Sequence, residues 1–176
     1  MHFVQMTTFR ALLTDSARVG FIMGAGDVIS QTWVEKRDIR NIDVNRMLRF
    51  ASVGIIFVGP VLKTWYGTLD KLVPKTDPPF KRGLKKMALD QLVFTPGFVA
   101  SVLGVIGLAN GQTRAQIKES LREDYFMILS RNYMLWPAAQ IINFSVVPIN
   151  YQVLFAQFVA VIWNTYLSMK LNEGKK

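Results

Sequence analysis

The chain has 176 residues, which is room for one domain, with 51% hydrophobic residues, 19% charged residues and a net charge of +9. Cysteine is absent, which excludes disulfides and cysteine-ligated zinc. The basic residues lie in short clusters between apolar segments and accompany no nucleic-acid motif. We therefore expect them to face anionic membrane lipids, and we expect no direct binding of nucleic acid. The clusters are Lys36, Arg37, Arg40, Arg46 and Arg49, then Lys71, Lys75, Lys81, Arg82, Lys85 and Lys86.

Two long stretches of the chain carry no charged side chain. No Asp, Glu, Lys or Arg lies between Arg131 and Lys170, and none lies from Gln91 to Thr113. As a single helix the first stretch would be roughly 57 Å long, whereas a hydrocarbon core is about 30 Å thick and is crossed by about 20 residues. It is therefore too long for one crossing and about right for two, and the second stretch is long enough for one. A soluble helix of this length needs a charged face toward water.

The N-terminal segment, residues 1–18, differs in composition from the apolar segments. It carries Arg10 and Arg18, several Ser and Thr residues, and Asp15 as its only acid. This composition is weakly typical of a transit peptide and equally of an amphipathic helix lying at the membrane interface. We interpret it as an interfacial or targeting segment.

The middle of the chain, residues 19–169, is predicted to be an all-α, multi-pass transmembrane bundle, followed by a polar tail at 170–176. The first apolar segment is short and contains Asp27, so four and five crossings both remain open. Only the turn at 148–150 separates the last two segments. The five segments are Val19–Val34, Leu48–Leu69, Ala88–Asn110, Tyr125–Val147 and Tyr151–Met169.

Small residues and prolines occur inside these segments. Small residues four positions apart let membrane helices approach closely. Such pairs are Gly20 with Gly24, Gly97 with Ser101, Ala100 with Gly104, and Gly107 with Gly111. A proline removes a backbone hydrogen bond and kinks a helix, which membrane proteins tolerate where a neighbour or water satisfies the freed carbonyl. We predict kinks at Pro60, Pro96 and Pro137.

Several polar side chains lie in or at the ends of the apolar segments. A charge at the bilayer centre costs at least about 2.5–3.5 kcal/mol, so these side chains should face the bundle interior, pair together or line a wet cavity. One interpretation is that they hold helices together, and the other is that they line a polar pathway. The candidates are Asp27, Gln31, Lys63, Asp90, Gln91, Arg131, Gln140 and Asn143.

Catalytic motifs are absent from the sequence. The single histidine is His2, and there is no GxSxG, HExxH or phosphate-binding loop. We therefore expect no catalytic residues, no metal site and no cofactor.

A set of motifs resembles one membrane-protein family, the Mpv-seventeen and peroxisomal membrane protein family. The most specific string is Asn132-Tyr133-Met134-Leu135-Trp136-Pro137, followed by Gln140, Asn143 and Phe144. Other marks are Gly26-Asp27 with Gln31, Gly59-Pro60 with Trp65-Tyr66, Lys86-Met87 with Asp90-Gln91, and Trp163-Asn164 with Ser168. The resemblance runs from about Gly20 to Met169.

The resemblance implies a multi-pass protein of the mitochondrial inner membrane, with the peroxisomal membrane as the alternative location. It further implies a weakly selective, voltage-sensitive channel that contributes to membrane potential, oxidative-stress homeostasis and deoxynucleotide supply for mitochondrial DNA maintenance. Our hypothesis is a channel or solute pathway, and the alternative is a non-transporting scaffold that organises partners or lipid. A bundle of four to five helices is thin for a wide pore, which favours a homo-oligomer. The sequence does not identify the transported solute.

Overall fold

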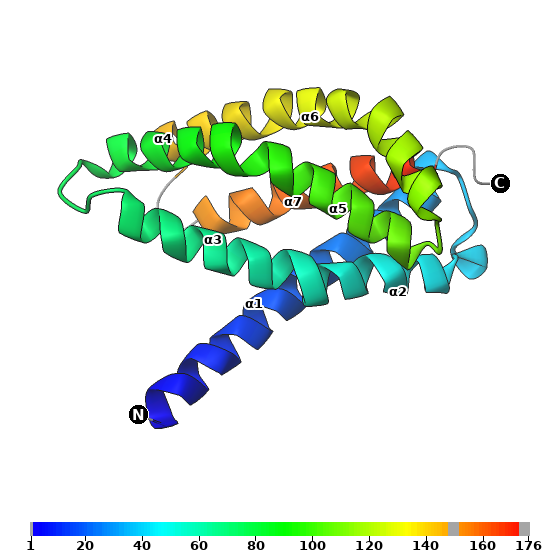
Figure 1. Ribbon diagram of the computed structural model, residues 1–176, viewed down its shortest axis with the longest axis horizontal. Helices are drawn as coiled ribbons and strands as arrows, with labels where there is room; N and C mark the ends of the chain where they lie inside the picture. Colours follow the sequence, from blue (N-terminus) through cyan, green and yellow to red (C-terminus); the bar gives the residue numbers. More distant parts are fainter. Residues whose placement is uncertain (1, 148–151, 173–176) are drawn as a thin grey trace. The chain divides into compact units, whose positions relative to one another are not determined.

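The computed structural model of the protein describes residues 2–147 and 152–172 (Figure 1). Over these residues the chain is helical and contains no strand, so the all-α class predicted from the sequence is confirmed. The chain divides into two compact units. We name them the N-terminal unit, Met1–Tyr66 with Asn164–Lys176, and the central unit, Gly67–Trp163.

The N-terminal unit is built around a long first helix. That helix takes in both the predicted interfacial segment and most of the first apolar segment. The second helix begins after Asp43, whose side chain accepts a hydrogen bond from the backbone N–H of Arg46 at 2.9 Å and so caps the helix. The elements are α1 (His2–Ile29), η1 (Ser30–Val34), η2 (Ile39–Asn41), α2 (Val44–Val53), η3 (Gly54–Val58), the start of α3 (Gly59–Leu72) and the end of α7 (Gln152–Asn172).

The central unit contains α4 (Pro79–Leu89), η4 (Asp90–Phe94), α5 (Thr95–Ala109) and α6 (Arg114–Ser145). Gly111 has a φ of +73°, which suits glycine, and Gln112 N–H donates to the Gly107 carbonyl at 2.9 Å to close the end of α5. Helix α6 then begins with a capping box in which Thr113 and Gln116 each accept the other's backbone N–H. This short connection places α5 and α6 side by side.

Two continuous helical runs among the described residues are long and apolar enough to cross a membrane. They are Val44–Leu72 with 29 residues and Phe80–Ala109 with 30 residues, each drawn as one unbroken helix in Figure 1. About 20 residues suffice for one crossing. The all-α membrane fold is therefore confirmed. The choice between four and five crossings stays a prediction, and the turn expected at 148–150 lies outside the described residues.

Two of the three prolines follow a π-helical turn. Gly59 N–H donates to the Gly54 carbonyl just before Pro60, and Thr95 N–H donates to the Asp90 carbonyl just before Pro96. In a π turn a backbone N–H bonds to the carbonyl five residues earlier instead of four, so the turn holds one extra residue. Such turns and prolines are both recognised irregularities of helices. The third proline, Pro137, lies inside α6, which continues through it. A kink at each proline stays a prediction.

Glycines let α1 approach the helical run Val44–Leu72 at backbone distance. A Cβ placed on Gly54 lies 2.6 Å from Gly20 Cα, and one placed on Gly59 lies 2.6 Å from Ser16 Cα. At Gly24, by contrast, an added Cβ makes an ordinary 3.4 Å contact with Ala51. The prediction that the first small-residue pair supports close helix packing is therefore confirmed at Gly20.

The small-residue pairs of α5 behave differently. An added Cβ meets nothing within 4 Å at Gly97 or Gly104 among the described residues, and Ser101 is exposed. Close packing at these pairs is therefore a wrong prediction for contacts within the described chain. Gly107 does pack closely, because a Cβ there lies 2.8 Å from the Ile117 side chain of α6.

Candidate functional site

Five side chains of the N-terminal unit, four of them buried and Glu35 half-buried, form a network that we name the charge cluster: Asp27, Gln31, Glu35, Arg46 and Ser168. Arg46 Nε donates to Asp27 Oδ1 at 2.7 Å, and Arg46 Nη2 donates to Glu35 Oε1 at 2.5 Å. The same Nη2 donates to Ser168 Oγ at 3.0 Å, and the Ser168 hydroxyl in turn donates to Asp27. One guanidinium therefore joins α1, the turn after it, and the end of α7.

The amide of Gln31 completes the cluster. Its Nε2 donates to Asp27 Oδ2 at 2.7 Å and to the Asp43 carbonyl at 3.1 Å, while its Oε1 accepts from the Asp43 N–H at 2.7 Å. The expectation that Asp27 and Gln31 share one helix face, four residues apart, is confirmed by this contact. Gln31 also ties the start of α2 to the end of the first helix.

Burial makes the pairing energetically important. Asp27 is 0% exposed and Arg46 is 3% exposed. A buried ion pair gains little over an apolar pair, but removing one partner leaves an uncompensated charge in a low dielectric. Arg46 also corrects the sequence interpretation, which placed it in a basic loop facing lipid headgroups. It is buried instead because Asp27 and Glu35 together need a cation.

The lowered pKa of Glu35 predicts that the stability of the fold depends on pH. Burial opposes its ionisation, but the hydrogen bond and charge of Arg46, with help from Arg37, prevail and lower its pKa below the ordinary 4.5. The unfolded chain then binds this proton more readily than the folded chain. Stability from Glu35 is thus full above the unfolded pKa and is lost as the pH falls through the lowered folded pKa.

We expect the melting temperature of the purified protein in detergent to drop as the medium is acidified below about pH 4.5, the range in which this linkage acts. Glu35→Gln should lower the melting temperature at neutral pH and make that acid drop shallower. The pKa of Asp77 is also lowered, by its hydrogen bond with Lys85, so Asp77 adds a further loss of stability in acid. This loss is the same in the wild type and in the Glu35→Gln variant. Parallel melting curves at all pH values would contradict the role given to Glu35.

The central unit holds a second group of buried polar side chains, on η4 and α6. The Tyr133 hydroxyl donates to the Gln91 carbonyl at 2.9 Å, and the Tyr125 hydroxyl donates to the Pro96 carbonyl at 3.1 Å. In the π register the Gln91 carbonyl faces position 96, where proline has no N–H to donate. A neighbouring helix therefore satisfies the carbonyl that the proline frees, as expected.

Two buried amide oxygens, one on η4 and one on α6, accept no hydrogen bond from the described residues. They are Gln91 Oε1 and Asn132 Oδ1, on side chains that are 9% and 6% exposed as residues. An unmade hydrogen bond at a buried acceptor costs about 1–3 kcal/mol. We name Gln91 and Asn132 the amide pair; Tyr133, the residue after Asn132, links the two positions through its contact with the Gln91 carbonyl.

The other candidates are members of neither the charge cluster nor the amide pair. Lys63 is half-buried and pairs with Asp15 in the N-terminal unit. Half-buried Asp90 accepts a hydrogen bond from the Gln91 amide at 2.9 Å, and Arg131 is exposed on α6. Further along α6, the side-chain amide of buried Asn143 donates a hydrogen bond to half-buried Gln140 at 3.4 Å. Trp136 is half-buried. The side chain of Phe144 is not among those that the structure describes.

Sequence reasoning missed Arg46, Glu35 and Ser168 as partners of Asp27, and it missed Asn132 as a buried polar side chain. Arg46 carried a usable signal, because a buried Asp27 requires a cation. Asn132 carried one too, because it lies on the same helix face as Ala139 and Asn143, seven and eleven residues further on. Glu35 and Ser168 gave no such local signal.

Comparison with known proteins gives a consistent result. The model described as "Mpv17 / PMP22 family" matches residues 107–168. The chain is 47% identical over 168 residues to the mitochondrial inner membrane protein Mpv17 of Drosophila melanogaster, covering 96% of this chain and 100% of that one. It is 44% identical over 154 residues to the human protein of the same name, covering 88% and 86% of the two chains.

A more distant relative is Protein sym-1 of Neurospora crassa, 36% identical over 159 residues, with 90% of this chain and 91% of that one covered. No solved structure matches the chain. The names of the animal relatives state the location predicted from the sequence. The chain is therefore a member of the Mpv17 / PMP22 family and a protein of the mitochondrial inner membrane.

Proposed function

We propose that the protein is a channel or solute pathway of the inner membrane, and that the amide pair of the central unit forms part of its lining. The observation that carries the proposal is that Gln91 Oε1 and Asn132 Oδ1 are buried and accept no hydrogen bond from the described residues. Channels replace the hydration shell of a passing solute with such oxygens. In such a pathway, water or solute donates the hydrogen bonds that these two oxygens do not receive from the described residues.

The local backbone supports the same proposal. Gln91 lies in a π turn, and π turns occur frequently at functional sites in helices. The hydroxyl of Tyr133 holds the Gln91 carbonyl at 2.9 Å, so the wider turn is fixed against α6. Rigid positioning of a few polar groups is what a selective lining needs.

The physiological role follows from the family resemblance. We propose that this pathway contributes to membrane-potential and oxidative-stress homeostasis and to deoxynucleotide supply for mitochondrial DNA maintenance. We also propose that it acts as a homo-oligomer, because one copy has few helices with which to surround a wide pore. The solute itself is to be identified by transport assays with nucleotides and small ions.

The test is reconstitution of the purified protein in planar bilayers. Gln91→Leu and Asn132→Leu each replace an acceptor that receives no hydrogen bond from the described residues by an apolar side chain of similar size. Gln91→Leu also removes the hydrogen bond from the Gln91 amide to Asp90, so the melting temperature of each variant is measured beside its conductance. We expect discrete conductance that falls about ten-fold in either variant, the effect of about 1.4 kcal/mol on a rate. Asn45→Leu, at an exposed position, makes the same chemical change and should leave conductance unchanged.

The second candidate function, a non-transporting scaffold, is favoured by the charge cluster, whose polar atoms bond to one another. Under that hypothesis buried polar groups only hold helices together. Well-folded protein that shows neither conductance nor solute flux in any lipid would rule out the channel. Wild-type conductance in both amide-pair variants would show that the amide pair does not line the pathway.

A further inference from the structure

The polar segments that connect the apolar helices differ in net charge. Residues 35–43 carry three basic and three acidic side chains, and residues 113–124 also carry three of each, so both sum to zero. Residues 70–86 carry six basic and two acidic side chains, a net charge of +4. We name residues 70–86 the basic hairpin. Positive charge is therefore concentrated in one connection and balanced in the two others.

The basic hairpin joins the two helices that are long and apolar enough to cross a membrane. One of them ends at Leu72 and the other begins at Phe80, which leaves residues 73–79 between them. Seven residues span at most about 25 Å, less than a hydrocarbon core of about 30 Å, and a non-helical segment is not stable in lipid. The basic hairpin must therefore lie at one membrane surface.

Ion pairs inside the hairpin use only part of its charge. Asp77 accepts a hydrogen bond from Lys85 at 2.6 Å and lies 3.6 Å from Lys81, and Asp70 pairs with Lys86 across the two helices. These pairs hold the hairpin together. Among the described residues, the remaining three basic side chains form no ion pair: Lys71, Lys75 and Arg82.

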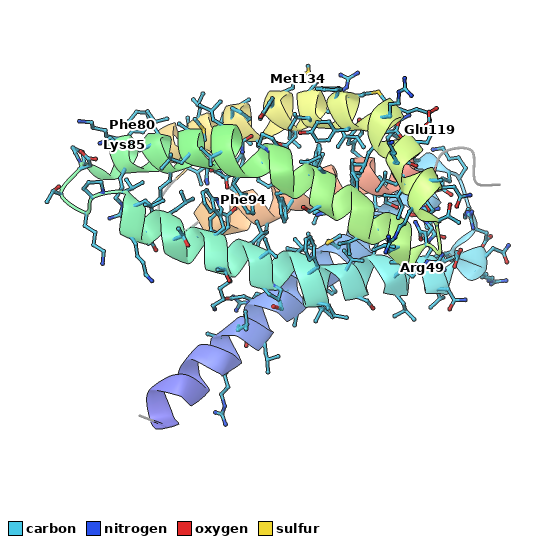
Figure 2. All side chains as sticks on the ribbon, in the orientation of Figure 1. Arg49, Phe80, Lys85, Phe94, Glu119 and Met134 are labelled. Atoms are coloured by element: carbon cyan, nitrogen blue, oxygen red, sulfur yellow. The ribbon has the colours of Figure 1, made fainter. Side chains whose placement is uncertain are left out.

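Apolar side chains accompany these cations. Leu72 is 59% exposed and Phe80 is 48% exposed, whereas Val73 beside them is buried in the turn. Figure 2 shows Phe80 and Lys85 at the same end of α4. Cations within a few residues of exposed apolar side chains match a molecule with an anionic phosphate at one end and hydrocarbon at the other.

We propose that the basic hairpin binds the phosphodiester headgroup of an anionic membrane phospholipid through Lys71, Lys75 and Arg82, with its acyl chains against Leu72 and Phe80. Basic residues next to a membrane helix contribute about five-fold each to affinity for an anionic surface. Three of them together should contribute roughly a hundred-fold. A zwitterionic phospholipid lacks the net charge and gains little.

The test measures lipid binding to the full-length purified protein by native mass spectrometry, with phosphatidylglycerol and phosphatidylcholine titrated separately. The triple variant Lys71→Gln, Lys75→Gln, Arg82→Gln removes the three cations without breaking an ion pair. We expect its affinity for phosphatidylglycerol to fall by roughly a hundred-fold and that for phosphatidylcholine to stay the same. The matched control removes three exposed cations from the neutral segments: Arg40→Gln, Lys118→Gln and Arg122→Gln.

Equal loss of phosphatidylglycerol in the triple variant and the control would overturn the proposal, as would no loss in either. Inorganic phosphate is added as competitor in a further arm. Displacement of the lipid at millimolar phosphate would assign the hairpin to a soluble anion instead. Retention of the lipid under that challenge supports a membrane source.

A second variant changes the charge in the opposite direction and covers the case in which the triple variant does not fold. Asp77→Asn frees Lys81 and Lys85 from their partner and raises the net charge of the hairpin by one. We expect it to bind phosphatidylglycerol about five-fold more tightly. Unchanged or weaker binding in a protein with wild-type helix content would overturn the proposal.

Discussion

Replacing Arg46 by glutamine is expected to destabilise the protein by about 3–5 kcal/mol, the cost of leaving a buried charge without its partner. Folded domains are stable by about 5–15 kcal/mol, so the loss is a large part of the total. The reason lies in the charge cluster. Without the guanidinium, Asp27 stays fully buried with only amide and hydroxyl donors, and Glu35 loses its 2.5 Å contact. We expect a strongly lowered melting temperature in detergent and a low yield of monodisperse protein.

Two further variants separate charge pairing from other effects of the change. Arg40→Gln removes an exposed arginine from the neighbouring loop and should leave the melting temperature unchanged. Asp27→Asn combined with Arg46→Gln removes both buried charges, so the double variant should be more stable than Arg46→Gln alone. If Arg46→Gln melts like the wild type, the charge cluster does not stabilise the N-terminal unit.

The second large effect is expected at Gly54. Its Cα faces the backbone of Gly20, so the added methyl group of Gly54→Ala would lie 2.6 Å from Gly20 Cα and 3.0 Å from Gly20 N. Backbone atoms of a packed helix cannot rotate out of the way as a side chain can. Overpacking of this kind costs about 1–3 kcal/mol and occasionally more. We expect a clear loss of thermal stability in detergent.

Gly97→Ala is the matched control, because Gly97 is also a helical glycine but an added methyl group there meets nothing within 4 Å among the described residues. Alanine is favoured over glycine inside a helix by about 1 kcal/mol, so this variant should be as stable as the wild type or slightly more stable. Equal destabilisation by both substitutions would show that helix approach at Gly54 does not explain the effect.

The separation along the chain between contacting residues explains which parts of the candidate site the sequence predicted. The pairing of Asp27 with Gln31 was predictable, because four residues make one helical turn. The pairing of Arg46 with Ser168 was not, since 122 residues separate them. The same holds for the amide pair: Gln91 was a candidate from its place in an apolar segment, but its contact with Tyr133 spans 42 residues.

The sequence by itself determined that this is an all-α membrane protein, because long uncharged runs have one favourable environment and one backbone structure within it. It also carried the motifs of its family. Only the tertiary structure decided that Arg46 is buried rather than facing lipid, that Gly54 rather than Gly97 lies at a helix contact, and that a tyrosine satisfies the carbonyl freed by Pro96. Hydropathy and helix periodicity are properties of neighbouring residues, whereas a counter-ion, a contacting backbone or a hydrogen-bond donor comes from whichever distant segment the fold brings near.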